Sequence, residues 1–205
     1  MAAALAGPPE AQAGAFAALV LRNRTIRSLL ERLATLDLLP AWYLAAGALA
    51  QTVWNTAAGN DPAYGVRDYD LVYFDDSDLS YDAEDTVIRY VAAACDDITE
   101  LVETRNEARV HLWYPDRFGI AIPPYRDLND AVDSFPATCT TIGMHLAAGV
   151  LTVYATHGFA DVLSLIARPN PAGIAPPHVF DDRAARWTAK WPQLTVRRDR
   201  IEAAR

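Results

Sequence analysis

Two aspartates, Asp68 and Asp70, stand one residue apart in the alternating, β-prone run of residues 66–74, which predicts a strand. Residues two apart in a strand point the same way, so both carboxylates leave one face, ~7 Å apart along the chain. Like charges this close repel unless a cation holds them, and paired hard oxygen donors suit Mg²⁺ or Mn²⁺. The alternative is that the acids line a solvent-exposed face next to the acidic turn at residues 75–78.

A pair of small residues, Gly47 and Ala48, lies between an apolar predicted strand at 42–46 and a predicted helix at 49–54. Small residues at such a junction let backbone N–H groups approach a phosphate at the helix N-terminus. Alternatively, the glycine only permits close packing. A phosphate cradle followed by a metal-binding acid pair on the next strand supplies what phosphoryl transfer needs.

Several stretches in order give the chain a family resemblance, at residues 46–55, 64–75, 106–114, 158–163, 168–170, 186–187 and 191–192. The chain resembles the polymerase-β-like nucleotidyltransferase superfamily, most closely a bacterial group of nucleotidyltransferase family proteins, over roughly residues 40 to 195. The resemblance implies an α/β (α+β) fold with a small mixed sheet flanked by helices. It also implies that a hydroxyl attacks the α-phosphorus of a nucleoside triphosphate and releases pyrophosphate, with Mg²⁺ or Mn²⁺ held by Asp68 and Asp70.

A more distant likeness is to the head of CCA-adding enzymes and poly(A) polymerases. Their Gly-Gly-x-Val-Arg-Asp signature corresponds to residues 47–52, with Gln51 in place of the arginine and Thr52 in place of the aspartate. The likeness implies that Gly47, Ala48, Gln51 and Thr52 bind the nucleotide.

The third carboxylate of the superfamily's metal site lies on a neighbouring strand, which here corresponds to residues 108–114. Alternation along a strand would put Arg109, His111 and Trp113 on one face, with His111 where the acid is expected. Histidine can ligate Mn²⁺ or act as a base for the incoming hydroxyl, but it lacks the negative charge that Mg²⁺ favours. The alternative is a strand histidine that hydrogen-bonds to a neighbour.

Two arginines and an asparagine are further candidates for binding the nucleotide. Arg109 could meet a triphosphate through its planar fork, or pair with one of the two aspartates. Arg168 and Asn170 precede a rigid proline in a loop that could bind a base or a phosphate. Alternatively, Arg168 bonds the last carbonyls of its own helix.

Lys190 lies between Trp187 and Trp191 near the end of the last predicted helix. A cation beside aromatic faces could hold a stacked base and its phosphates. Tryptophans at helical spacing are also typical of a core.

The length and the composition along the chain predict one domain. Residues 1–13 are expected to be disordered, and residues 14–205 to form a single nucleotidyltransferase-like domain. Apolar spacing predicts one amphipathic helix over 15–39, and Ser80 is expected to cap a helix that runs to about residue 95. Strands are predicted at 99–104 and 108–114, and helices at 128–135, 159–167 and 182–190. Residues 137–144 and 151–154 fit either strand or helix.

The amino-acid composition limits the kinds of partner and the cellular compartment that are expected for this protein. The formal charge of −8 argues against non-specific binding to DNA or RNA, because the overall field would repel phosphate. Cys95 and Cys139 lack metal-type spacing and are expected to be reduced, as in a cytoplasmic protein. The apolar residues 15–21 are too few to span a membrane, and no targeting signal is recognised.

Three functions remain open. The first is a nucleotidyltransferase whose acceptor is a tRNA end, a protein side chain or a small molecule. The second is a catalytically degenerate module of the same fold that binds a nucleotide or a partner, suggested by the altered glycine motif and the missing third acid. The third, a metal-dependent phosphohydrolase, ranks last because the chain has only 4 histidines.

Overall fold

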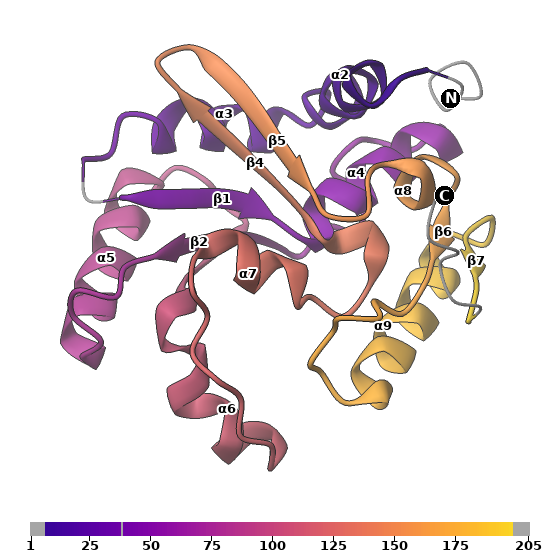
Figure 1. The fold of residues 1–205 in the computed structure, drawn as a ribbon. Coiled ribbons are helices and arrows are strands. Elements are labelled where there is room, and N and C mark those ends of the chain that lie inside the picture. The colour runs from indigo at the N-terminus through magenta and orange to yellow at the C-terminus, as the bar shows by residue number, and fades with distance from the viewer. Residues whose placement is uncertain (1–6, 38, 199–205) are drawn as a thin grey trace.

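A five-stranded mixed sheet is the centre of the computed structural model, which describes residues 7–37 and 39–198 (Figure 1). The strand order is β3-β2-β1-β4-β5. β2 and β3 are parallel, and the other neighbours are antiparallel. The strands are β1 (Ala41–Ala45), β2 (Asp68–Phe74), β3 (Leu101–Asn106), β4 (Ile142–Ala147) and β5 (Val150–Ala155). The predicted α/β class with a mixed sheet is confirmed.

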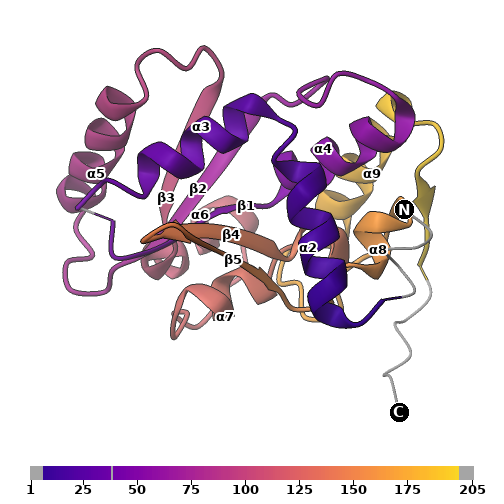
Figure 2. The ribbon, with the colours of Figure 1, turned by 90° about the horizontal axis from the view of Figure 1, so that it is seen from above.

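Alternation along β1 and β2 assigns the two faces of the sheet. Leu44 and Leu71 point into the main core, which includes residues from α2 (Pro9–Val20), α3 (Arg24–Leu33), α4 (Gly47–Ala58) and α5 (Tyr81–Ala94). Ala45 and Val72 point to the opposite face and pack against α7 (Leu128–Asp133). Figure 2 shows α3 and α5 together on the first face. Asp68 and Asp70, which are even-numbered like Val72, therefore open on the α7 face.

The N-terminal helical region is broken, where the sequence predicts one continuous helix over 15–39. Asn23 ends the first segment and caps α3, because its side chain accepts hydrogen bonds from the N–H groups of Thr25 and Ile26. α2 begins at Pro9, so the prediction of disorder is wrong for residues 9–13. Residues 1–6 of that prediction lie outside the described residues.

The predicted strand at 108–114 is also wrong. β3 ends at Asn106, whose side chain bonds Asp75 and accepts from the N–H of Ala108, which turns the chain out of the sheet. A short 3₁₀ helix, η1 (Glu107–Arg109), leads directly into α6 (Val110–Phe118). The residues at 108–114 that seem to alternate as in a strand instead belong to a helix, in which residues three and four apart share a face.

The C-terminal third also differs in detail from the predicted elements. Residues 142–155 form the β4–β5 hairpin after η2 (Thr138–Thr140). The predicted helix at 159–167 shortens to α8 (Ala160–Leu163), because the chain reverses at Leu165 (φ 56°) into β6 (Ile166–Ala167), which pairs with β7 (Thr195–Val196). α9 (Pro177–Lys190) starts earlier than predicted, with proline in its first turn.

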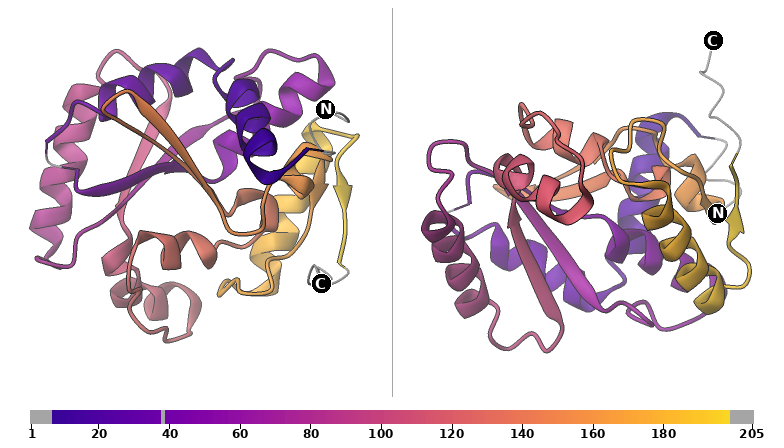
Figure 3. Two further views of the ribbon diagram at one scale, coloured as in Figure 1. Left: turned by 45° about the horizontal axis from the view of Figure 1, so that its top comes forward. Right: turned by 90° about the horizontal axis from the view of Figure 1, so that it is seen from below.

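Helices α6, α7 and α9 lie on one side of the molecule, and α6 and α9 are separated from each other (Figures 1 and 3). No helix in the described ranges is long and apolar enough to cross a membrane. Ser80 caps α5 by accepting from the N–H of Ala83, as predicted.

Candidate functional site

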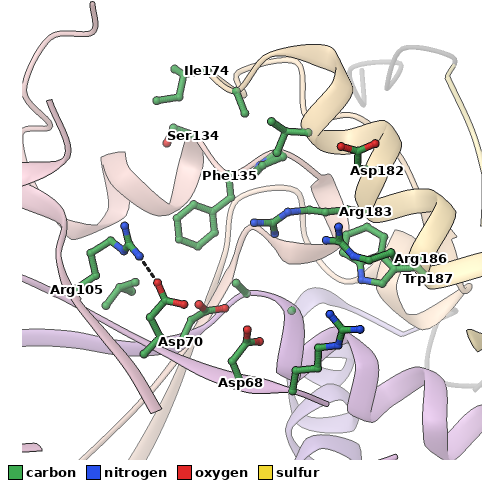
Figure 4. A pocket seen from close by; sticks show the side chains of 18 of the residues that line it. Asp68, Asp70, Arg105, Ser134, Phe135, Ile174, Asp182, Arg183, Arg186 and Trp187 are labelled. Atoms are coloured by element: carbon green, nitrogen blue, oxygen red, sulfur yellow. Dashed lines mark hydrogen bonds and ion pairs between the residues drawn. The ribbon is translucent and has the colours of Figure 1, made fainter. Parts of the chain in front are cut away.

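A cavity of about 810 Å³ lies on the α7 face of the sheet, and Asp68 and Asp70 form part of its floor (Figure 4). Neither carboxylate makes a hydrogen bond or an ion pair with any other described residue. Burial raises the pKa of Asp70 to about 6, and the charges of Asp68 and Glu103 add to the shift. Two unpaired acids on one floor are therefore held at an electrostatic cost that a cation would relieve.

A third carboxylate stands directly opposite Asp70 on the neighbouring strand. Glu103 of β3 is the parallel partner of Asp70, lines the cavity and forms an ion pair with Arg105. Sequence reasoning missed Glu103, although it lies in the strand predicted at 99–104 and a parallel register would have placed it there. His111, expected in this role, lies on α6 and is not among the residues that line the cavity.

A fourth acid, Glu107, follows β3 and also lines the cavity. Only 5% of its surface is exposed, and its side chain makes no hydrogen bond to the described part of the chain. Burial raises the pKa of Glu107 to about 7; Arg105 opposes the shift and Asp70 adds to it. Sequence reasoning missed Glu107 because it was placed in the connection between the two strands predicted at 99–104 and 108–114.

The N-terminus of α4 meets the same floor. Ala46, with φ 58°, turns the chain from β1 into the helix, and no side chain in the described part of the protein caps the first N–H groups. Gly47 and Gln51, two of the residues predicted to bind the nucleotide, line the cavity, and a Cβ at Gly47 would lie 3.0 Å from Nε2 of Gln51. Uncapped N–H groups beside a glycine are able to receive an anion.

Ala48 and Thr52 point away from the cavity. Both are buried in the core, where the Thr52 hydroxyl donates to the carbonyl of Ala48 and accepts from Asn23. The side chain of Thr52 therefore has a packing role in α4, and a contact of Ala48 with a ligand is limited to its backbone.

Helix α9 supplies the basic wall of the cavity. Arg183 and Arg186 extend over the acids from the side opposite Arg105 (Figure 4), and neither makes a hydrogen bond or ion pair within residues 7–37 and 39–198. Lys190 also lines the cavity, where its ammonium donates to the carbonyl of Gly65 at 2.7 Å. The spacing of these three residues, three and then four apart, marks one helix face and could have been recognised in the sequence.

The other predicted nucleotide-binding residues hold the fold together elsewhere. Arg168 forms an ion pair with Asp161. Asn170 donates to the backbone carbonyls of Asp133 and Phe135. Neither Arg168 nor Asn170 lines this cavity.

Arg109 is engaged in a buried ion pair with Glu84 and also donates to the carbonyl of Leu79. The side chains of Arg109 and Glu84 are 12% and 11% exposed. Neither Asp68 nor Asp70 is its partner, because the helical turn at η1 carries Arg109 away from the strand face.

Replacing Arg109 by methionine is expected to lower the free energy of unfolding by about 3 kcal/mol, since it leaves the charge of Glu84 buried and unpaired. Denaturant unfolding measures the change. Arg89→Met, which breaks an exposed pair with Asp85, is the control and should cost less than about 0.5 kcal/mol. Equal stabilities for the two variants would show that Arg109 is free for another role.

A divalent cation fits the floor only together with a ligand. Among the described residues, no three His, Cys, Asp or Glu side chains are grouped closely enough to hold a metal by themselves. Mg²⁺ is commonly bound by one or two carboxylates, with substrate phosphates and water completing its shell. Asp68 and Asp70 match this donor set, and the arginines of α9 and the α4 N-terminus could receive the phosphates.

Comparisons with known proteins agree with this geometry. A sequence model of a family described as nucleotidyltransferase matches residues 31–196. The fold is similar to that of a solved NMR structure described as revealing a CCA-adding enzyme head domain, with a TM-score of 0.68 and 23% identity over 84% of this chain and 89% of that chain. No curated protein matches the chain.

Proposed function

The chain belongs to the nucleotidyltransferase family, and on this premise we propose that it moves a nucleoside monophosphate from a nucleoside triphosphate to a hydroxyl acceptor, with release of pyrophosphate. The proposal rests on one observation: acidic and basic side chains face each other across one cavity. Asp68 and Asp70 face Arg183 and Arg186 beside the N-terminus of α4. None of these four side chains has a hydrogen-bond or ion-pair partner among the described residues, and none of those residues caps the helix with its side chain. A cation and a polyphosphate together would neutralise both sets of charges.

The parts of the triphosphate would be divided among the elements. The β- and γ-phosphates would bind the N–H groups at Gly47 and the guanidinium groups of Arg183 and Arg186. The α-phosphate would lie over Asp68 and Asp70. A divalent cation held by these two acids would supply charge neutralisation at the phosphate oxygens.

In the transfer step, the acceptor oxygen forms a bond to the α-phosphorus and the bond from that phosphorus to the bridging oxygen breaks. Pyrophosphate leaves with the bonding electron pair, near the basic wall that stabilises its charge. Glu103, which forms an ion pair with Arg105 and stands opposite Asp70, is placed to receive the proton of the acceptor hydroxyl. We therefore assign to Glu103 the role that the sequence suggested for His111.

The direct test offers triphosphates of all four bases, radiolabelled on the α-phosphate, to bulk tRNA, cell-extract protein and small hydroxylated compounds. Transfer of label to one class identifies the acceptor. If nucleotides bind but no acceptor is labelled, the catalytically degenerate binding module becomes the better description. Glu103, the third acid of the site, is paired with Arg105, and this ion pair competes with a role of Glu103 as a base. This observation favours the second function.

Cation and triphosphate are expected to bind together, because the acids repel a triphosphate unless a cation lies between them. Calorimetry should detect little or no triphosphate binding in chelator and clear binding with Mn²⁺ or Mg²⁺. Equal affinity in both conditions would rule out a shared metal at Asp68 and Asp70.

A further inference from the structure

The cavity has a second end, beside Glu107, which the proposed phosphate and metal contacts leave unused. Its wall is one face of α6, whose residues follow each other at spacings of three, one, three and one: Val110, Trp113, Tyr114, Arg117 and Phe118 all line the cavity. Tyr125 and Phe135 line it as well. An aromatic wall of this kind suits a flat ring.

Two polar groups at this end have no hydrogen-bond partner among the described residues, and they differ in whether a ligand can reach them. Tyr114 is 4% exposed, and its buried hydroxyl forms no hydrogen bond in the part of the chain that the structure describes. Glu107, 5% exposed, likewise lacks a side-chain hydrogen bond there. The Tyr114 hydroxyl has almost no accessible surface, so a ligand in the cavity cannot reach it. The carboxyl group of Glu107 lines the cavity, and a ligand that bonds to it would supply the missing hydrogen bonds.

Tyr125 lies near both of these groups. Burial raises the pKa of Tyr125, the hydrogen bond to Ser134 lowers it, and the nearby Glu107 and Tyr114 raise it further. The hydroxyl proton of Ser134 is used by the carbonyl of Ala131 at 2.8 Å, so the Tyr125 hydroxyl must donate to Ser134 at 2.6 Å. Tyr125 therefore has no proton left to donate to Glu107, whose carboxyl group stays available to a ligand.

We infer that this end of the cavity binds the guanine base of the nucleoside triphosphate, with the Glu107 carboxylate accepting from N1–H and the 2-amino group. The inference rests on the proposed function. Guanine alone among the four bases presents two adjacent N–H donors to a carboxylate. Adenine and cytosine place a ring-nitrogen acceptor beside their amino group, and uracil offers one N–H between two carbonyls. Each therefore meets repulsion at the ionised carboxylate of Glu107, which is the main form above its raised pKa of about 7.

Calorimetry with Mn²⁺ and each of GTP, ATP, CTP and UTP tests the inference. Wild-type protein should bind GTP at least about tenfold more tightly than the other three triphosphates, because guanine makes at least one more charge-assisted hydrogen bond to the protein. Glu107→Gln should remove most of this preference, because its amide turns a donor toward the donors of guanine, while ATP affinity stays within about twofold.

Glu31→Gln, an exposed change on α3, is the matched control and should keep the wild-type preference. Melting curves confirm that Glu107→Gln folds, which is expected because the carboxyl group that it replaces makes no hydrogen bond to the described residues. Four triphosphates bound equally well, or a Glu107→Gln variant that still prefers GTP, would overturn the guanine site while leaving the proposed function intact. Failure of all four to bind with Mn²⁺ would overturn both.

Discussion

Replacing Asp70 by asparagine is expected to lower nucleotide transfer roughly a thousandfold or more while leaving the protein at least as stable as the wild type. Asparagine keeps the shape of the side chain but removes the charge that would anchor a cation beside Asp68. Loss of activity without loss of stability is typical of residues placed for chemistry at a cost to the fold.

The stability difference between Asp70→Asn and the wild type should depend on pH in a direction that the pKa of Asp70 determines. The pKa of Asp70 is raised from 3.8 to about 6, so the folded protein holds a proton that the unfolded chain releases. The wild type therefore loses stability as pH rises from about 4 to about 6, by roughly 1 to 3 kcal/mol. Asp70→Asn avoids this loss, so its advantage should be full above pH 7 and absent below pH 4.

Thermal melts at pH 4 and pH 7.5, beside the labelling assay, measure both effects. Asp68→Asn should also abolish transfer, whereas Asp76→Asn, an exposed acid in the turn after β2, should change neither activity nor stability. An Asp70→Asn protein that labels acceptors as fast as wild type would mean that the acid pair takes no part in the reaction.

The arginines of α9 give the second large effect. Arg183→Ala and Arg186→Ala should each weaken triphosphate binding by about tenfold to a hundredfold, since each removes charge-assisted hydrogen bonds to a phosphate. Neither side chain has a partner among the described residues, so the fold should lose little. The binding of a nucleoside without phosphates should be unchanged.

Calorimetry across a range of salt concentrations separates this effect from a general change in charge. Arg27→Ala, an exposed arginine on α3 across the sheet, removes the same net charge and is the control. If it weakens binding as much as Arg183→Ala, long-range electrostatics and not contact explains the loss. If Arg183→Ala and Arg186→Ala bind normally, the triphosphate lies elsewhere.

The sequence by itself determined the parts of the site that depend on neighbouring residues. Asp68 and Asp70 share a face because a strand repeats every two residues, and Gly47 begins α4 because a strand meets a helix there. The same local reasoning failed at residues 107–114, where the side chain of Asn106 turns β3 into a helix. His111 and Arg109 were misplaced with that one error.

Only the tertiary structure decided what surrounds the acids. Glu103 reaches Asp70 through the parallel register of β2 and β3, and Arg183 and Arg186 come from a helix more than a hundred residues downstream. The aromatic face of α6 meets the same cavity from a third direction. Such contacts depend on how helices pack on a sheet, which residue spacing within one element does not specify. The chemistry of each residue was visible in the sequence, and the packing decided which residues act together.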